Sequence, residues 1–300
     1  MNRYEWSEVF MSIEGEAKYT GHPTAYIRFA RCNFQCRGFN NPENLDTTSV
    51  SVLGFDPKDY NNIYSIPLIH KGCDSIYSWD KNFEHMWKKG SSSMLGQEVL
   101  KVLPHNSFIN PKSGKRVILS LTGGEPTLRM KFIPELLHAS ELNECRHVLI
   151  ETNCAVPLKN QHLKELALWA HAKQGHITWS NSPKLSISGE KWNEAIRPEI
   201  ALAQIEALQM LVGTKAKGGD QYFKFVCDAS DQSFEEVEQA MSEYYASGVP
   251  KETEIYIMPV ACTEEQQQEV AASVAVKCID RGFIYCHRIQ NSVFGNGVGT

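Results

Sequence analysis

The chain has 300 residues and a formal net charge of −5, with 42% hydrophobic and 22% charged residues. This composition is typical of a soluble globular protein and excludes a disordered or collagen-like chain. No run of about 18 apolar residues occurs, so no membrane span is expected. The acidic balance argues against direct nucleic-acid binding, and a small molecule is the expected partner.

In chain order, short runs rich in β-branched and aromatic residues alternate with segments of helical periodicity. Strands are predicted at residues 24–30, 116–122, 147–152, 176–181, 222–228, 254–260 and 283–289. Helices are predicted at residues 93–103, 132–142, 161–172, 199–211, 233–248 and 263–282. Thr263 and Gln266 could form a capping box at the start of the last helix. The alternation predicts an α/β fold of parallel βαβ units, either a doubly wound sheet or a partial or full barrel.

One segment, residues 37–72, interrupts this alternation. It holds three prolines, five asparagines and no sustained periodicity. A loop of this length in a compact domain is usually functional or flexible. We expect a single domain over residues 1–300, with residues 37–72 as an insertion.

The N-terminal residues, MNRYEWSEVFMSIEGEA, are interrupted by acids and are not typical of a secretory signal. We therefore expect a cytoplasmic protein, in whose reducing compartment the nine cysteines form no disulfide framework. Most of these thiols should be small buried core side chains. Four cysteines in or beside apolar stretches fit that expectation: Cys145, Cys227, Cys278 and Cys286.

Cys32 and Cys36 differ, because they follow the first predicted strand in the text RFARCNFQC. A strand end that delivers two thiolates four residues apart is a candidate metal site. Taken alone, this C-x3-C spacing is weak evidence.

Three later strand ends carry polar residues or glycines. They are Gly123, Gly124 and Glu125 in GGEP, Glu151 and Asn153 in ETN, and Ser182 and Lys184 in SPK. Paired glycines let the backbone approach a ligand closely, an acid accepts from an ammonium group, and a lysine suits a carboxylate. Because the carboxyl ends of parallel strands meet, these groups would surround an amino-acid-like ligand.

These motifs, in this order and at these intervals, resemble the radical S-adenosylmethionine superfamily. The opening FMSIEGEAKYTGHPTAYIRFARCNFQC is similar to the 7-carboxy-7-deazaguanine synthase family, which reads approximately F-x-S-I-Q-G-E-G, then G-x-P, then F-I-R-L-x-G-C-N. The SPKL text and the ending VFGNGVG are similar too. The resemblance covers nearly all of the chain outside residues 37–72, and it implies a partial (β/α)6-type barrel.

The main departure concerns the third cysteine of the superfamily pattern C-x3-C-x2-C. That position holds Phe39, which cannot ligate iron. The family's C-D-T text is found displaced, as Cys73-Asp74-Ser75. We therefore interpret the motif as C-x3-C-x36-C, in which Cys32, Cys36 and Cys73 ligate a [4Fe–4S] cluster and residues 37–72 are inserted between the second and third ligands.

The resemblance implies how S-adenosylmethionine is bound and used. One iron of the cluster would stay open for its amino and carboxylate groups, and its reductive cleavage would give methionine and a 5′-deoxyadenosyl radical. Glu125 with the Gly123–Gly124 backbone would receive the amine. The remaining contacts implied are Ser182 and Lys184 to the carboxylate, Glu151 and Asn153 near the ribose or carboxylate, and Met258 at the adenine edge.

The family's substrate is 6-carboxy-5,6,7,8-tetrahydropterin, which undergoes radical ring contraction with loss of ammonia. By the same resemblance, Glu16 would accept the pterin N–H groups and Arg28 would clamp a carboxylate. Ser75 preserves a hydroxyl that the family gives to Mg²⁺. Either His287 or Gln290 would face the substrate, and the sequence does not choose between them.

The expected partners are an electron donor such as flavodoxin or ferredoxin and a second copy of the chain in a homodimer. Two alternatives compete with the synthase. An activase of a glycyl-radical enzyme would share the cluster and GGEP, but would be expected to keep the compact C-x3-C-x2-C motif. A non-enzymatic iron–sulfur or zinc protein would leave GGEP, ETN and SPK unexplained. Whether the product serves a tRNA base or a DNA base stays open.

Overall fold

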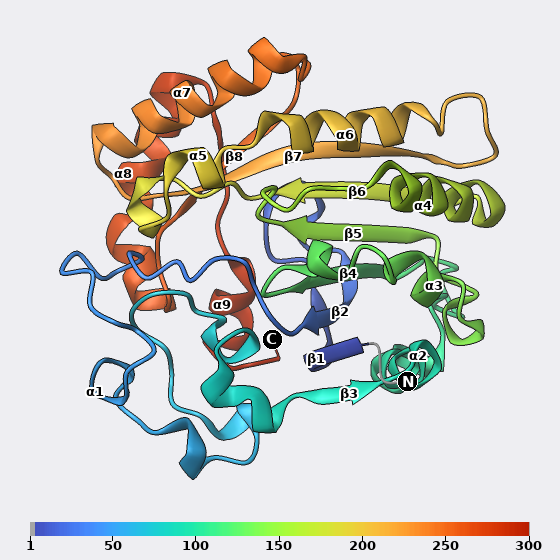
Figure 1. Ribbon diagram of the computed structural model, residues 1–300, viewed down its shortest axis with the longest axis horizontal. Coiled ribbons are helices and arrows are strands. Elements are labelled where there is room, and N and C mark those ends of the chain that lie inside the picture. Colours follow the sequence, from blue (N-terminus) through green and yellow to red (C-terminus); the bar gives the residue numbers. More distant parts are fainter. Residues whose placement is uncertain (1–3, 300) are drawn as a thin grey trace.

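The fold is built around one curved sheet of nine strands within residues 4–299, which the computed structural model describes (Figure 1). The strands are β1 (Tyr4–Ile13), β2 (Pro23–Phe29), β3 (Lys88–Gly90), β4 (Ile118–Gly123), β5 (His147–Thr152), β6 (His176–Asn181), β7 (Gly218–Cys227), β8 (Ile255–Pro259) and β9 (Ile284–Tyr285). Their order in the sheet is β3-β1-β2-β4-β5-β6-β7-β8-β9. Strands from β2 to β9 pair in parallel, whereas β1 is antiparallel to β2 and to β3.

Helices lie between most of the parallel strands. They are α1 (Val50–Leu53), α2 (Ser92–Val102), α3 (Ile133–Leu137), α4 (Asn160–Lys173), α5 (Trp192–Ala195), α6 (Pro198–Gln209), α7 (Asp231–Ser247), α8 (Glu264–Arg281) and α9 (Ile289–Phe294). The sheet curves, and β3 and β9 stand at its two edges, so it does not close (Figure 1). The predicted α/β fold of the partial-barrel kind is confirmed.

Most predicted elements agree with the structure, and the capping box of Thr263 and Gln266 is present at the start of α8. The predicted strand 283–289 is wrong beyond Tyr285. Cys286 N–H still donates to Ile257 C=O at 2.9 Å, and then the chain turns into α9. The predicted helix 132–142 is interrupted at Ala139, whose extended backbone separates α3 from a short 3-10 turn.

Strand β1 was not predicted, because its acids disguise a buried strand. Glu8 is 1% exposed and accepts from Arg28 Nε at 2.5 Å, and Glu5 accepts from Arg31 Nε at 2.7 Å. Both arginines come from β2 or the residues directly after it. The pairing satisfies charges that would otherwise be costly to bury beside an apolar face.

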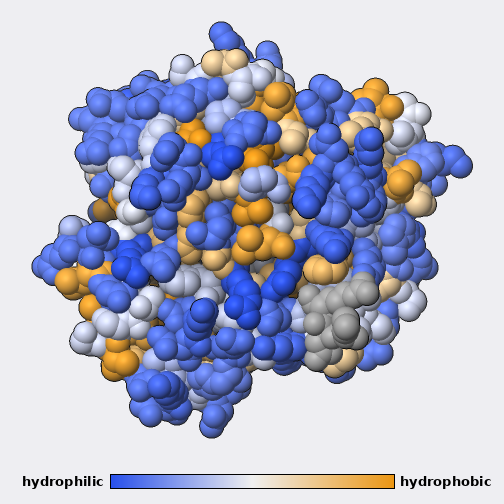
Figure 2. All heavy atoms as spheres, in the orientation of Figure 1, coloured by the Kyte–Doolittle hydropathy of each residue, from blue (hydrophilic) through white to orange (hydrophobic). Residues whose placement is uncertain are grey.

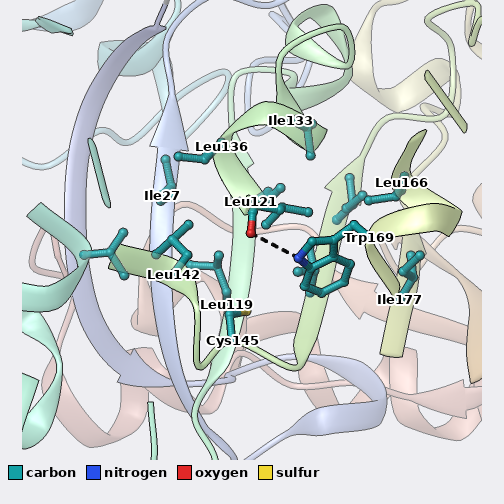
Figure 3. Close-up of a cluster of buried hydrophobic side chains, with 14 of the residues drawn as sticks. Ile27, Leu119, Leu121, Ile133, Leu136, Leu142, Cys145, Leu166, Trp169 and Ile177 are labelled. Atoms are coloured by element: carbon teal, nitrogen blue, oxygen red, sulfur yellow. Dashed lines mark hydrogen bonds between the residues drawn. The ribbon is translucent and has the colours of Figure 1, made fainter. Parts of the chain in front are cut away.

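The main hydrophobic core lies between the sheet and helices α2, α3, α4 and α6 (Figure 3). Leu119 and Leu121 of β4 contribute fully buried side chains. Trp169 of α4 is also fully buried, and its indole N–H donates to Leu137 C=O at 3.1 Å. This bond removes the desolvation cost of the one polar atom of the ring and joins α4 to the end of α3.

Segment 37–72 leaves the barrel and returns to it at one place. Gly72 N–H donates to Phe39 C=O at 2.6 Å, so the residues between them form a closed excursion. The excursion carries α1 and short 3-10 turns, and its side chains Phe55, Ile63 and Ile69 share a small separate core with Ile76 and Phe83. In Figure 1 it lies beside the carboxyl ends of the parallel strands, at the lower left.

Hydrophilic side chains cover most of the outer surface in the face shown in Figure 2, and hydrophobic residues gather nearer its middle. Within residues 4–299, no helix combines the length and apolar character that crossing a bilayer requires.

A polar cluster closes the barrel at the amino ends of the strands, opposite the strand-end motifs. Asp220 accepts from Thr178 Oγ1 at 2.6 Å and from Tyr19 Oη at 2.9 Å, and Lys18 pairs with it at 3.0 Å. His147 Nε2 lies 2.9 Å from Thr178 Oγ1. Because the hydroxyl proton points to Asp220, His147 must donate through Nε2 as a neutral ring. Burial, reinforced by the nearby His176, lowers the pKa of His147 to about 3.

This cluster predicts an acid-labile contribution to stability. The pKa of His147 is lowered on folding, so the unfolded chain takes up a proton below about pH 6.5 that the folded chain refuses. As the pH decreases from about 6.5 towards the folded pKa, the free energy of unfolding should therefore decrease. This residue contributes at most about 1.4 kcal/mol per pH unit to the decrease.

Urea unfolding at several pH values, with wild type compared with His147→Gln, measures the effect. Glutamine keeps a donor for Thr178 and does not titrate, so its stability should depend less on pH. Equal pH dependence in the two proteins would contradict the assignment to His147.

Candidate active site

A cavity of about 370 Å³ opens at the carboxyl ends of the parallel strands. Part of its wall comes from residues 64, 66–69 and 72 of segment 37–72, and part from residues 296–299 of the C-terminal tail. Of the sixteen site residues predicted from the sequence, all line the cavity except Glu125 and His287. The strand-end motifs therefore meet as the parallel topology requires.

Cys32 and Cys36 lie on the loop that follows β2. Glu190 fixes this loop, since its Oε1 accepts from the backbone N–H groups of Gln35 at 2.8 Å and Cys36 at 2.7 Å. The backbone of Cys36 is left-handed, with φ +49°, which turns the chain sharply towards Phe39. The loop is thus held from outside by a carboxylate, leaving both thiols on the cavity wall.

Cys73 reaches the same place from the far end of segment 37–72. The bond from Gly72 N–H to Phe39 C=O sets Cys73 beside the position that a third local cysteine would occupy. Cys32, Phe39 and Cys73 pack against one small cluster that includes the buried Cys36. The three cysteines of the proposed C-x3-C-x36-C motif therefore stand together on one cavity wall.

Burial and nearby charges set the pKa values of the three thiols. Burial is the main cause that raises the pKa of Cys32 to about 12, that of Cys73 to about 11 and that of Cys36 well above its ordinary value. Lys184 opposes the rise at each of them. Buried thiols of this kind lose their protons on binding a metal, which releases the penalty that burial imposes on a bare thiolate.

Two other cysteines near the site differ from these three. Cys154 is fully buried behind the ETN strand, away from the cavity wall, with Gln204 as a neighbour. Cys262 does line the cavity, but its thiol donates to Gly72 C=O at 3.5 Å. It therefore supports the base of segment 37–72.

The GGEP turn packs directly on the cysteine loop. A Cβ on Gly123 would lie 2.2 Å from Phe29 O, and one on Gly124 would lie 2.2 Å from Arg31 O, so only glycine fits at either place. Glu125 is fully buried, and its carboxylate accepts from both the backbone N–H and the hydroxyl of Thr127, among other groups. Glu125 therefore stabilises the turn, and Gly123 and Gly124 line the cavity.

The ETN and SPK strand ends complete this side of the cavity. Glu125 also accepts from Asn153 N–H at 2.7 Å, and Asn153 Nδ2 donates to Asn33 at 2.8 Å, which ties the ETN end to the cysteine loop. Lys184 Nζ donates to Ser182 Oγ at 3.1 Å. These contacts leave a hydroxyl and an ammonium group side by side on the wall, an arrangement that suits a carboxylate ligand.

The other side of the cavity is dominated by paired charges. Lys224 of β7 is 5% exposed and donates to Glu16, and it stands 4.0 Å from Glu151. Burial alone would raise the pKa of Glu16, but the charges of Lys224 and Arg288 lower it overall. Glu16 is therefore an ionised acceptor on the cavity wall.

Arg28 lies partly buried between β1 and the residues that follow Cys73. Its Nε bonds to Glu8 at 2.5 Å, and its Nη1 donates to Ser75 Oγ at 3.2 Å. A guanidinium carries five N–H donors, so these contacts leave others for a ligand. Ser75 Oγ also donates to Asp74 at 3.1 Å.

Of the two alternatives His287 and Gln290, only Gln290 is on the cavity lining. His287 contacts Gln267 at 2.8 Å and Tyr285 at 2.9 Å, outside the cavity lining. Gln290 lines the cavity and donates to Glu16 at 3.3 Å.

Sequence reasoning missed four charged residues of the wall, namely Glu14, Asp74, Lys224 and Arg288. Lys224 gave a signal, because it is a lone charge inside the apolar run YFKFVC. Arg288, 6% exposed and bonded to Asp74 at 2.5 Å, gave none, since its partner lies more than 200 positions away.

Comparison with known proteins identifies what this site resembles. No protein-family model matches the chain. The chain is 24% identical to the 7-carboxy-7-deazaguanine synthase of Rhodopirellula baltica over 298 residues, which cover 98% of the chain and 88% of that protein. It is 24% identical over 257 residues to the synthase of Clostridium acetobutylicum, covering 86% of the chain and 81% of that protein. The match to the Methanopyrus kandleri synthase, 26% identical over 161 residues, spans 53% of the chain and about half, 52%, of that protein.

The chain is similar in sequence to the 7-carboxy-7-deazaguanine synthases. The resemblance predicted from the motifs is confirmed by these matches, which extend along nearly the whole chain. Among solved structures, the crystal structure of QueE from Escherichia coli aligns with a TM-score of 0.45 and 18% identity, over 95% of this chain and 93% of that one.

The position of Cys73 predicts the outcome of cysteine substitution. After anaerobic reconstitution with iron and sulfide, Cys73→Ala should lose nearly all bound iron, as Cys32→Ala and Cys36→Ala should, because a cluster lacking one of three protein thiolates is poorly held. Iron per chain and the visible absorbance of the cluster measure the result.

Matched controls come from the neighbouring cysteines and from Phe39, which occupies the place of the third cysteine in the compact motif. Cys154→Ala and Cys262→Ala should retain iron, and so should Phe39→Ala. Normal iron in Cys73→Ala together with loss in Cys154→Ala or Cys262→Ala would move the third ligand and contradict the long-insertion motif.

Proposed function

We propose that this chain is a 7-carboxy-7-deazaguanine synthase. It would use a [4Fe–4S] cluster and S-adenosylmethionine to convert 6-carboxy-5,6,7,8-tetrahydropterin into 7-carboxy-7-deazaguanine, by radical ring contraction with loss of ammonia. The observation that carries the proposal is the convergence of three cysteines, the glycine, ETN and SPK strand ends and a charged wall on one cavity. The names of the similar proteins support the same reaction.

The residues present suit a cluster with its organic cofactor. Cys32, Cys36 and Cys73 offer the thiolates that such clusters use, and Lys184 supplies a nearby positive charge. When bound, the cluster and S-adenosylmethionine supply radical chemistry that belongs to the cofactors. Within residues 4–299 no three His, Cys, Asp or Glu side chains are placed to hold a single metal ion.

The wall near the cysteines would hold the amino-acid part of S-adenosylmethionine. The Gly123–Gly124 backbone packs closely on the residues before Cys32, and its carbonyl oxygens would accept hydrogen bonds from the amine. Ser182 with Lys184 would bind the carboxylate. Met258 at the end of β8 would contact the adenine.

The charged wall would orient the pterin. Ionised Glu16 accepts from ring N–H groups, while Arg28 donates to the carboxylate through the donors that Glu8 and Ser75 leave free. Gln290, bonded to Glu16, would contact the ring beside it. Such fixed donors and acceptors hold a substrate in one orientation at little entropic cost during reaction.

Turnover tests the proposal directly. The reconstituted chain, given a strong reductant and S-adenosylmethionine without oxygen, should convert the carboxytetrahydropterin into a product with the mass of 7-carboxy-7-deazaguanine. Glu16→Gln should keep its iron but lose at least about tenfold in turnover, because one charge-assisted hydrogen bond is worth roughly 1.5–3 kcal/mol.

Two results separate the alternatives. Cleavage of S-adenosylmethionine with the pterin left untouched would reject the synthase and favour another radical enzyme, such as an activase. Binding of iron with no cleavage would favour a non-enzymatic iron–sulfur protein.

Magnesium fits the present arrangement less well. The Ser75 hydroxyl is of the right chemical kind, but it accepts from Arg28, and the neighbouring Asp74 bonds to Arg288. A magnesium role nevertheless predicts that Ser75→Thr keeps any magnesium stimulation of turnover and that Ser75→Ala abolishes it while retaining iron. Full stimulation in Ser75→Ala would end that role.

We also propose an electron donor, an oligomeric state and a location for this protein. The electron donor is a small electron-transfer protein such as flavodoxin or ferredoxin, the assembly is a homodimer, and the location is the cytoplasm. All three rest on the family resemblance.

A further inference from the structure

Three acids of the cavity wall, Glu14, Glu16 and Glu151, lie near a single lysine, Lys224. Lys224 bonds to Glu16 and stands 4.0 Å from Glu151, while Glu14 has no ion pair within residues 4–299. Glu151 also accepts from Ser120 Oγ at 2.7 Å. Among the described residues, Glu14 is thus the one acid of the three without a cationic partner.

The contacts of Glu14 are all with neutral donors. The residue is 4% exposed; its Oε2 accepts from Tyr26 Oη at 3.0 Å, and its Oε1 accepts from Glu16 N–H at 3.3 Å. It reaches the cavity wall from the turn that follows β1. The other titratable groups that face it come from several elements: Tyr26, Glu151, Tyr222, Lys224 and Cys286.

The charge balance of this wall favours one retained proton. If all three acids were ionised, three negative charges would stand around Lys224 in a buried region. The second nearby cation, Arg288, acts on Glu16 but is itself paired with Asp74. Like charges at short range disfavour simultaneous ionisation, and burial disfavours each charge further. Burial, followed by the charges of Glu151 and Glu16, raises the pKa of Glu14 to about 8.

The neighbouring weak acids do not supply an alternative negative charge. Burial raises the pKa of Tyr26 and of Tyr222 well above their ordinary value, and that of Cys286 to about 12. All three therefore stay protonated at neutral pH, and Glu14 is the group of this wall that changes charge under mild conditions.

We propose that Glu14 is a protonated carboxylic acid at neutral pH and that it donates a hydrogen bond from its O–H to an oxygen acceptor of the ligand, such as a ring carbonyl. An ionised carboxylate can only accept, whereas the acid form both donates and accepts. The wall then offers two carboxyl groups of opposite character: Glu16 accepts N–H groups, and Glu14 donates to an oxygen. The ligand class in this statement rests on the proposed function, but the proton on Glu14 does not.

Infrared spectroscopy of the protein tests the proton without any ligand. The difference spectrum between wild type and Glu14→Gln at neutral pH should contain the carbonyl stretch of a carboxylic acid, shifted in heavy water. That band should give way to a carboxylate band as the pH rises through about 8. No acid band at neutral pH would overturn the proposal.

Tyr26→Phe is the matched variant for the assignment. The phenol donates to the Glu14 carboxylate and so lowers its pKa, and its removal should move the midpoint of the infrared transition to higher pH. A midpoint that does not move would assign the band to a different acid, and would also overturn the proposal.

Ligand binding tests the donor role. The probe is 6-carboxypterin, a fully oxidised relative of the proposed substrate, titrated by fluorescence into the reconstituted protein with S-adenosylmethionine at several pH values. The ratio of the Kd of wild type to that of Glu14→Gln should stay constant below about pH 7 and rise about tenfold per pH unit above the pKa of Glu14. Ionisation of the probe affects both proteins alike and cancels in the ratio. A ratio that is flat over the whole range would overturn the donor role.

The two readouts keep the proposals apart. An acid band that titrates as expected, with no binding of 6-carboxypterin by either protein, would count against the proposed function and support the proton on Glu14. Conversely, tight binding with no acid band would support the proposed function and reject the inference about Glu14.

Discussion

One backbone hydrogen bond, from Gly72 N–H to Phe39 C=O, brings the two parts of the cysteine site together. A single bond of this kind contributes only about 1 kcal/mol to stability, so it cannot hold the site by itself. Two further contacts act at the same junction. The Cys262 thiol donates to Gly72 C=O, and Arg288 bonds to Asp74, the residue after Cys73. Both come from the last third of the chain, so the third proposed ligand is positioned by the strand end of β8 and by the turn before α9 as much as by its own segment.

The charged wall depends on ion pairs that join separate elements. Arg28 of β2 pairs with Glu8 of β1, Lys224 of β7 pairs with Glu16 after β1, and Arg288 pairs with Asp74. Replacing such a pair by apolar residues is often harmless to stability, but removing one partner commonly costs about 3–5 kcal/mol because a bare charge stays buried. These pairs therefore fix where the remaining acceptors and donors point.

The wall also explains why the acid at position 14 differs from the acid at position 16. The two lie two residues apart on the same turn, yet Glu16 bonds to Lys224 and Glu14 bonds to the phenol of Tyr26. The difference arises from the curvature of the sheet, which brings β7 against the turn after β1 at Glu16 and β2 against it at Glu14. Local sequence gives both residues the same chemistry, and tertiary packing makes them unequal.

The parts of the fold and site that could be predicted are those with a local cause. Strands β5 and β6 are apolar runs bounded by polar residues, and GGEP needs glycines where a Cβ would meet Phe29 O or Arg31 O. The remainder has causes that are distant in sequence. Strand β1 was missed because the arginines that neutralise Glu5 and Glu8 lie about 20 positions or more away. Arg288 escaped notice for the same reason, because its partner Asp74 is distant in sequence.

The length of segment 37–72 has a modest energetic cost that its own packing can offset. In the compact pattern two residues separate the second and third cysteines, and here 36 do, which is about four doublings of loop length. Each doubling adds roughly 0.6 kcal/mol of closure entropy, so the longer loop costs about 2.5 kcal/mol more to close. Phe55, Ile63 and Ile69 are each at least 92% buried in the separate core of the segment, and burying one such side chain contributes about 1.5–3 kcal/mol. That core includes Tyr77, which lines the cavity and donates to Glu8, the partner of Arg28. The packing that compensates for the long loop is therefore the same packing that attaches it to the floor of the cavity, and the segment can form a wall of the site without weakening the position of Cys73.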